Sequence, residues 1–218
     1  MENGTSIWSV RAALFELLSL SFRYPEDEEL PRAVASGEWD AAAREIAEAL
    51  GLEWPSVPGG EAAWHGEFSE LHAALRVEST RLFVGAPEPE VSPYEGVWRS
   101  RTDGVQPLAF VNPYSMAVER FVGKCGFGQP DGMNEPLDSV WAELEFLQTV
   151  CMIEYGALEA PSCAQPTDDD WAATYRMFLE QHALAWMPHF AEEVKSKSRV
   201  PFYRAAADLL GAFLRSVA

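Results

Sequence analysis

Apolar residues recur at steps of three and four along most of the chain, which is the spacing that gives an α-helix one buried face. Segments with this pattern are residues 6–22, 39–50, 61–83, 112–125, 168–182 and 202–217. Another helix is predicted to begin at Asn134, because asparagine is a good N-cap and Pro136 is tolerated in a first helical turn. Apolar residues from Leu137 to Cys151 would then share one face of that helix. No segment shows the period of two that a half-buried strand requires, so the pattern predicts an all-α fold.

Glycine and proline separate the predicted helices from one another. A short acidic helix is predicted between Glu26 and Gly37, and the run Trp186–Pro188 is predicted to bend or restart the helix before it. Connectors without a period are residues 54–60, 84–106 and 159–167. The whole pattern is typical of a single globular helical bundle of roughly eight to ten helices, with residues 1–218 as one domain.

The connector over residues 84–106 differs from an ordinary loop, because it holds the aromatic side chains of Tyr94 and Trp98 among its prolines and glycines. Long ordered loops are often functional. The alternative is that the two rings only anchor the loop on the core. Both interpretations stay open at this point.

Composition limits the kinds of partner that the protein can have. Nearly half of the 218 residues are apolar (48%), which indicates a globular protein with a real core. The 16 basic and 34 acidic residues give a net charge of −18. A field of this sign repels nucleic acid and anionic lipid and attracts basic ligands, so no nucleic-acid partner is expected.

Cysteine usage and the N-terminus favour a reduced, cytoplasmic location. Cys125, Cys151 and Cys163 form no CxxC pair, so neither a disulfide framework nor a zinc site is predicted. The first nine residues lack the basic and apolar regions of an export signal. No apolar run reaches the length of a membrane span, so no stable membrane insertion is expected.

Signatures of catalysis are absent. The chain has no GxSxG, GxxxxGK[ST], GxGxxG or HExxH motif. His65 and His72 stand seven residues apart, as do His182 and His189, whereas metal ligands on one helix usually lie three or four apart. The sequence therefore predicts no enzyme, no metal site and no bound cofactor.

The charged residues that remain to be explained are the carboxylates between Cys125 and Tyr175, a stretch without any Lys, Arg or His. Glu135 and Asp138 lie at the predicted helix start, opposite its apolar face. Carboxylates there can simply stabilise the positive end of the helix dipole. Because no local cation neutralises these acids, we instead expect a cationic partner. Aromatic rings beside carboxylates suit a peptide that carries arginines and an apolar segment.

Three blocks of the sequence resemble the signature blocks of the TorD/DmsD-type redox-enzyme maturation chaperones. Residues 81–85 (RLFVG) and 93–98 (PYEGVW) resemble the family's RLF-x-G and PP-x-(E/G)-S-V-(Y/W). Residues 135–139 (EPLDS) resemble its E-P-x-D-H, and residues 182–188 (HALAWMP) with the later PFY resemble its HLLPWLP … FY ending. The resemblance spans most of the chain from Arg81 onward, with the blocks in the family's order.

The sequence departs from these blocks at three positions. Ser139 stands where the family usually has histidine, Ser92 where it has the first of two prolines, and Gly96 where serine is commoner. If the family's histidine contacts the ligand, this chain must bind differently or bind a different leader.

The resemblance implies an all-helical cytoplasmic chaperone. Such a protein binds the twin-arginine leader, and the apo form, of a molybdopterin oxidoreductase catalytic subunit and delays its export until the cofactor is inserted. The peptide-binding residues implied are Pro93, Tyr94, Glu95, Trp98, Glu135, Pro136, Asp138 and Ser139. Alternatives are a maturation factor for a reductase subunit without a leader, or a helical metal or small-molecule enzyme. The client, the choice between monomer and homodimer, and any bound nucleotide or cofactor stay open.

Overall fold

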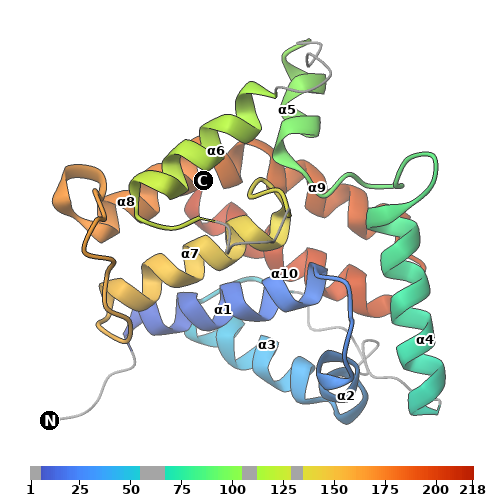
Figure 1. Cartoon of the computed structure of the whole chain (residues 1–218). Coiled ribbons are helices and arrows are strands. Elements are labelled where there is room, and N and C mark those ends of the chain that lie inside the picture. Colours follow the sequence, from blue (N-terminus) through green and yellow to red (C-terminus); the bar gives the residue numbers. More distant parts are fainter. Residues whose placement is uncertain (1–5, 55–66, 105–111, 129–134) are drawn as a thin grey trace, which may run out of the picture. The chain divides into compact units, whose positions relative to one another are not determined.

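The computed structural model describes residues 6–54, 67–104, 112–128 and 135–218 (Figure 1). These residues form α-helices and short π- and 3₁₀-turns without a strand, which confirms the predicted all-α class. The helices in them are α1 (Ile7–Phe22), α2 (Glu29–Ser36), α3 (Glu38–Ala49), α4 (Phe68–Ser79), α5 (Glu95–Thr102), α6 (Pro113–Lys124), α7 (Val140–Glu154), α8 (Trp171–Phe178), α9 (Leu184–Lys197) and α10 (Pro201–Val217).

The chain divides into two compact units that are interleaved in sequence. Unit 1 consists of Met1–Glu16 and Pro93–Met187, and unit 2 consists of Leu17–Ser92 and Pro188–Ala218. Helices α1 and α9 therefore contribute residues to both. The prediction of one domain over the whole chain stays a prediction.

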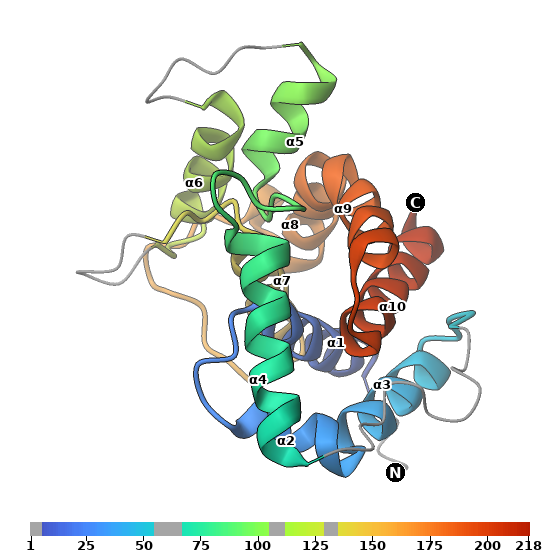
Figure 2. The same cartoon turned by 90° about the vertical axis from the view of Figure 1, so that its right-hand side faces the viewer.

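Aromatic side chains of α3, α9 and α10, of the end of α1 and of the π-turn after α4 form the core of unit 2. Figure 2 shows the ribbons of these helices. The ring of Phe190 lies 5.2 Å from that of Phe22 and 5.9 Å from that of Phe83. Trp39 packs edge-on against Phe202 at 5.1 Å. All five side chains are at most 5% exposed. Burial of such large rings supplies most of the hydrophobic stabilisation of a unit of this size.

Unit 1 has its own aromatic core, in which α7 packs on α8 and α5 on α6. The rings of Phe146 and Phe178 are 4.6 Å apart, and Phe121 of α6 lies 5.2 Å from Phe178. The guanidinium of Arg11 lies over the rings of Trp8 and Tyr175, at 4.9 and 5.1 Å. These contacts join the first part of α1 and the helices α6 to α8 in the core of unit 1.

The predicted start of the helix at Asn134 is wrong. Helix α7 begins at Val140, and its N-cap is Ser139, whose backbone is extended (φ −77°, ψ 149°) and whose Oγ accepts a hydrogen bond from Ala142 N at 3.3 Å. Asn134 itself lies outside the described residues. Both Asn134 and Ser139 are good N-caps by residue type, and a tertiary contact of Ser139, described below, selects the later one.

Two other boundaries also differ from the prediction. The predicted loop over residues 84–106 contains helix α5, which the 3.6-residue pattern could not reveal because it is only eight residues long. The predicted helix over residues 61–83 is not continuous, since Glu67 is extended (φ −65°, ψ 144°) and α4 begins at Phe68. Its last turn widens into a π-helix over Thr80–Val84. Trp64 and His65 lie outside the described residues.

The helix does not restart at Trp186–Pro188, which was one of the two outcomes predicted there, and the alternative of a bend stays a prediction. Pro188 lies inside α9, and the irregular turn comes earlier, as a π-helix over Leu179–Ala183. A wide turn before the proline leaves room for its ring, which otherwise clashes with the preceding turn.

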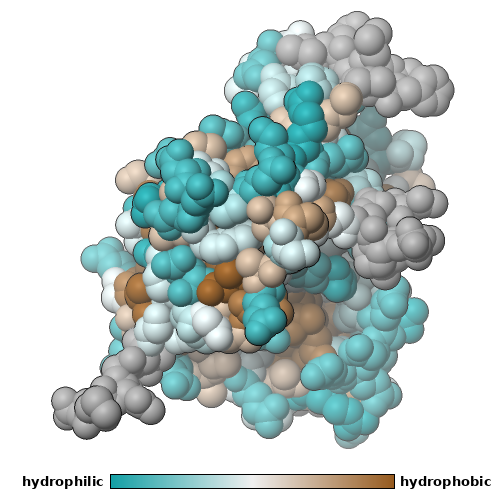
Figure 3. Space-filling model, turned by 60° about the vertical axis from the view of Figure 1, so that its left-hand side comes forward, coloured by the Kyte–Doolittle hydropathy of each residue, from teal (hydrophilic) through white to brown (hydrophobic). Residues whose placement is uncertain are grey.

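Hydrophilic side chains cover most of the face shown in Figure 3, and hydrophobic ones form small patches between them. Among the described residues, the exposed large hydrophobic side chains are Ile7, Leu20, Val77, Val84, Met116, Tyr155 and Leu158. No helix in the described part of the chain has the length and apolar character needed to cross a membrane.

Candidate functional site

The two stretches singled out by the sequence, residues 93–98 and 135–139, meet in unit 1. Tyr94 and Ser139 form an isolated antiparallel β-bridge. Val140 N donates to Pro93 O at 2.8 Å, and Glu95 N donates to Asp138 O at 2.9 Å. The bridge places the first turn of α5 beside the first turn of α7, and the extended backbone that it imposes on Ser139 is the reason that α7 starts there.

Asp138 is a buried residue, only 3% exposed, and its carboxylate points into the protein. Its Oδ2 accepts hydrogen bonds from Gly96 N at 3.1 Å and from Ser115 Oγ at 2.5 Å. Because Gly96 is the second residue of α5, Asp138 caps that helix from a distance of 42 residues in the sequence. No ion pair joins Asp138 to a cation among the described residues.

Gly96 is needed at this junction for space and not for backbone freedom. A Cβ atom there would lie 2.5 Å from Asn112 Nδ2 and 2.6 Å from Ser115 Oγ. The serine that is commoner in the resembling family would not fit this packing. The departure at Gly96 therefore has a local structural reason.

Glu95 is completely buried and forms two polar side-chain contacts. Its Oε1 accepts from Arg99 Nη1 at 2.9 Å, one helical turn later, and its Oε2 lies 2.9 Å from His182 Nδ1. The i,i+4 spacing of Glu95 and Arg99 was a signal available in the sequence. The partner His182 was not, because it lies 87 residues away.

Glu143 lies next to Glu95 and is also fully buried. Both of its carboxyl oxygens are 3.2 Å from the indole Nε1 of Trp186, which donates to them. Burial raises the pKa of Glu143 well above its ordinary value, and the negative charge of Glu95 raises it further. Both effects favour the protonated, neutral form of Glu143.

The accessible part of the junction consists of Tyr94, Glu135 and Pro136, which we call the Tyr94–Glu135 surface, and the buried ring of Trp141 lies behind it. Glu135 and Pro136 are exposed and Tyr94 is half-buried. The ring of Trp141 lies edge-on to that of Tyr94 at 6.3 Å, and its Nε1 donates to Glu135 Oε1. Trp98, which the sequence analysis paired with Tyr94, lies on the second turn of α5 and is partly exposed.

The carboxylates of Glu135 and Asp138 lie close enough to the Tyr94 hydroxyl to change its pKa. Burial raises the pKa of Tyr94, and the charges of Glu135 and Asp138 raise it further, so the hydroxyl stays protonated. The junction thus combines aromatic rings and an exposed carboxylate with a buried carboxylate behind them. No group of three or more metal-ligating side chains occurs in the described residues. The exposed carboxylate and the aromatic rings can bind a cation.

Comparison with known proteins supports the family resemblance of the sequence blocks that meet at this junction. The family model described as nitrate reductase delta subunit matches residues 34–192, more than half of the chain. The chain is 35% identical over 80 residues to the chaperone protein TorD of Aeromonas salmonicida, a match that covers 37% of the chain and 35% of the relative. It is 25% identical over 144 residues to the TorD chaperone of Aliivibrio fischeri and 27% identical over 145 residues to that of Vibrio cholerae.

These two longer matches cover 65% of the chain, and 61% and 59% of the relatives. All three matches thus span less than two thirds of the relatives' own length. The three relatives bear the name of a chaperone, in agreement with the prediction that this chain is not an enzyme.

Proposed function

Since the chain belongs to the nitrate reductase delta subunit family and is a TorD-type maturation chaperone, we propose that it binds a twin-arginine leader. The leader belongs to the catalytic subunit of a molybdopterin oxidoreductase, which the chaperone retains in the cytoplasm until its cofactor is inserted. The Tyr94–Glu135 surface contacts the arginines. Pro93, Glu95, Asp138 and Ser139 hold that surface in shape, and Trp98 extends it along α5.

The observation that carries this proposal is the buried Asp138 carboxylate, which has hydrogen-bond donors but no ion pair with a described residue. A carboxylate in a low-dielectric setting acts more strongly on a nearby charge than one in water. Asp138 and Glu135 together favour a cation beside Tyr94, because the charges of both carboxylates raise the pKa of the Tyr94 hydroxyl.

The expected energies explain why the partner should carry two arginines and an apolar segment. An exposed Arg–carboxylate pair contributes only about 0.2–1 kcal/mol. A guanidinium over an exposed aromatic ring adds about 0.5–1 kcal/mol. Neither contact alone gives a specific complex, so adjacent arginines and burial of a short apolar stretch against the partly exposed Tyr94 and Trp98 must act together.

Titration of a fluorescein-labelled twin-arginine leader peptide against the parent protein and its variants tests the proposal. We expect Tyr94→Ala and Asp138→Asn each to weaken binding about tenfold, or about 1.4 kcal/mol. Glu135→Gln should weaken it a few-fold, because that pair is exposed. A peptide with two lysines should bind less well than the arginine peptide, since lysine cannot form a bidentate pair.

Glu159→Gln is the matched control, because it removes one exposed carboxylate of the same unit outside the junction. It should bind the leader as the parent does. If Tyr94→Ala and Asp138→Asn also bind like the parent, the proposed site is wrong. If no leader of a molybdoenzyme binds to the parent, the proposed function is wrong.

A second candidate is a maturation factor for a reductase subunit that has no leader, and the matching family description, nitrate reductase delta subunit, favours it. This function predicts that the protein captures the apo subunit equally well with and without its N-terminal segment. A pull-down with the leaderless apo subunit separates it from the first candidate.

A further inference from the structure

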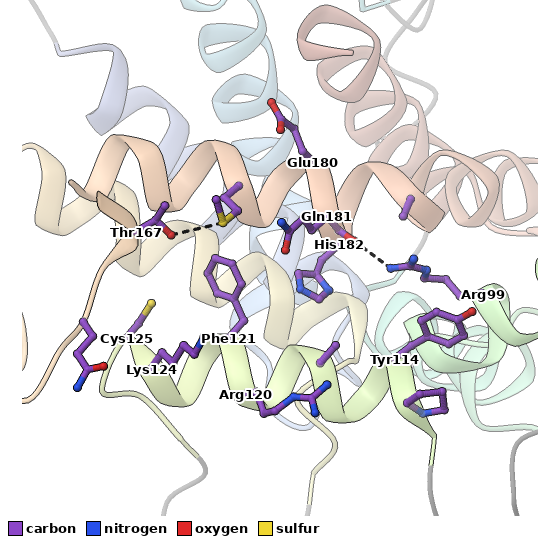
Figure 4. A pocket seen from close by; sticks show the side chains of 15 residues that line it. Arg99, Tyr114, Arg120, Phe121, Lys124, Cys125, Thr167, Glu180, Gln181 and His182 are labelled. Carbon is purple, nitrogen blue, oxygen red and sulfur yellow. Dashed lines mark hydrogen bonds between the residues drawn. The ribbon is translucent and has the colours of Figure 1, made fainter. Parts of the chain in front are cut away.

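Unit 1 also contains a cavity, and its chemical character differs from that of the Tyr94–Glu135 surface. It is a pocket of about 730 Å³ between α6 and the π-turn after α8, shown in Figure 4. Tyr114, Arg120, Phe121 and Lys124 of α6 line one wall, and Gln181 and His182 line the other (Figure 4). The pocket runs along α6 from Pro113 to Cys125, so its length is about 18 Å at 1.5 Å per residue.

The charge of this pocket is opposite to that of the chain. Its lining includes the cations Arg99, Arg120 and Lys124 and one acid, Glu180, whereas the whole chain has 34 acidic and 16 basic residues. In Figure 4 the Glu180 side chain points away from α6. Burial raises the pKa of the Cys125 thiol to about 11, so that group adds no negative charge at neutral pH.

Two of the cations are available to a ligand. Arg120 and Lys124 are exposed, stand one turn apart on α6, and form no side-chain ion pair or hydrogen bond with another described residue. Arg99 uses Nη1 for Glu95 Oε1 and for Gln181 O, both at 2.9 Å, and its guanidinium lies 4.5 Å from the centre of the Tyr114 ring. A guanidinium has five N–H donors, so further donors of Arg99 can serve a ligand at that end of the pocket.

Apolar and amide side chains separate these cations. Ala117, Phe121 and Met177 provide apolar surface, and Gln165 and Gln181 provide amides that can pair with a peptide backbone. A twin-arginine leader would be repelled by three cations, so this pocket has no place in leader binding. It needs a ligand with several separated negative charges and apolar groups between them.

We propose that the pocket along α6 binds an extended acidic peptide segment of a partner protein, with carboxylates at Arg99, Arg120 and Lys124. An extended chain advances about 3.3 Å per residue, so about five residues fill the 18 Å length. Alternating side chains of such a segment place carboxylates on the cations and apolar groups on Phe121 and Ala117. The pocket is thus a second docking site, independent of the leader-binding function.

Fluorescence anisotropy with a short labelled peptide of alternating aspartate and leucine or phenylalanine tests this proposal. A matched peptide with asparagine in place of aspartate measures the contribution of charge. We expect the acidic peptide to bind the parent and the asparagine peptide to bind at least about tenfold more weakly. Binding should weaken further with added salt, because the cations are exposed.

The double variant Arg120→Glu, Lys124→Glu should lower the affinity for the acidic peptide by about tenfold or more. The matched control is Arg44→Glu, Arg215→Glu, which changes the net charge equally through exposed residues of unit 2 and should leave binding unchanged. Ala117→Trp fills the pocket without changing charge and should also weaken binding. Circular dichroism checks that each variant is folded, and titration of the twin-arginine leader on the same variants should give the parent affinity.

The proposal is overturned if the parent binds the two peptides equally, or if the control double variant loses as much affinity as the pocket variant. It is also overturned if inorganic phosphate or ATP binds in the pocket while the acidic peptide does not, since the site would then accept small anions. Loss of leader binding alone would contradict the proposed function and leave this proposal standing.

Discussion

Two buried glutamates, Glu78 near the end of α4 in unit 2 and Glu143 in the first turn of α7 in unit 1, have opposite environments. Glu78 is 4% exposed and receives a bidentate pair from Arg81, with Nε and Nη2 at 2.9 and 2.8 Å. Arg199 N donates to it at 2.5 Å. Glu143 is 0% exposed, accepts hydrogen bonds from the indole of Trp186 and shares a side-chain hydrogen bond with Glu95.

The pKa values of the two carboxyl groups move in opposite directions from the ordinary value of 4.5. Burial raises the pKa of both. For Glu78 the hydrogen bonds from Arg81 and Arg199 outweigh burial, and the pKa is lowered. For Glu143 the charge of Glu95 acts in the same direction as burial.

The difference shows how burial of an acid depends on its partner. In unit 2 the cation Arg81, the first residue of the family-like RLF block, stabilises the ionised carboxylate of the buried Glu78. In unit 1 Arg99 is bound to Glu95, and no ion pair joins Glu143 to a cation among the described residues, so its raised pKa favours the neutral form. The negative charge at the candidate site therefore comes from Glu95, Asp138 and Glu135.

The largest expected effect is that of Glu78→Gln. Removing one partner of a buried ion pair leaves the guanidinium of Arg81 without its carboxylate, and we expect the free energy of unfolding to fall by about 3 kcal/mol. Urea unfolding followed by circular dichroism at pH 7 measures it. Glu193→Gln, which breaks the exposed pair with Lys197, is the control and should have little effect.

The pH dependence of the Glu78→Gln effect follows from the lowered pKa of Glu78. The unfolded chain binds the proton more tightly than the native one, so the stabilisation is fully present above pH 4.5 and is lost as the pH falls through the folded pKa. The difference between variant and parent should therefore be constant from pH 5.5 to 8 and shrink in more acidic buffer. A loss that stays under 1 kcal/mol at pH 7 would contradict the ion-pair interpretation.

A smaller effect is expected for Gly96→Ala, which tests the junction beneath the candidate site. The added Cβ would meet Asn112 and Ser115 at 2.5 and 2.6 Å, so we expect a loss of about 1–3 kcal/mol and weaker leader binding. Gly123→Ala on α6 is the matched control. Its Cβ meets no atom within 4 Å, and it should stabilise the protein by up to about 1 kcal/mol because alanine favours the helix. Equal effects of the two changes would show that Gly96 is not closely packed against Asn112 and Ser115.

The comparison also shows what the sequence can and cannot predict. The helical class follows from local periodicity, and most helix ends follow from glycines and caps such as Asn112 and Asp170. The start of α7 was mispredicted because Ser139 is selected by its bridge with Tyr94, a contact across 45 residues. Likewise, Asp138 was predicted to face a ligand, but it caps α5 and lies buried behind the surface.

The proximity of the two blocks was predicted, whereas the peptide-binding role of their residues stays a prediction. The family-like blocks indicated that residues 93–98 and 135–139 act together, and the structure brings them together. Trp141 was assigned only to the apolar face of a helix, although its ring faces Tyr94. The partners Ser115, His182 and Trp186 could not be predicted, because no local pattern connects them to Asp138, Glu95 or Glu143.

The smallest effect expected at pH 5 is that of Glu143→Gln. The direction in which this effect changes with pH distinguishes Glu143 from Glu78. A glutamine side chain has the shape and the donor of a protonated acid, so we expect the free energy of unfolding at pH 5 to change by less than about 1 kcal/mol. The native state binds the Glu143 proton more tightly than the unfolded chain. Glu143 therefore contributes fully to the free energy of unfolding of the parent protein below pH 4.5, and this contribution is lost as the pH rises towards the folded pKa.

Glutamine does not titrate, so Glu143→Gln should become steadily more stable relative to the parent between pH 5 and pH 8. Urea unfolding of both proteins across this range measures the trend, and Glu78→Gln, with no slope in the same range, is the internal control. A constant loss of about 3 kcal/mol for Glu143→Gln would mean that Glu143 is ionised in the folded protein. The two buried glutamates would then be alike, and Glu143 would add a further negative charge behind the surface proposed to bind arginine.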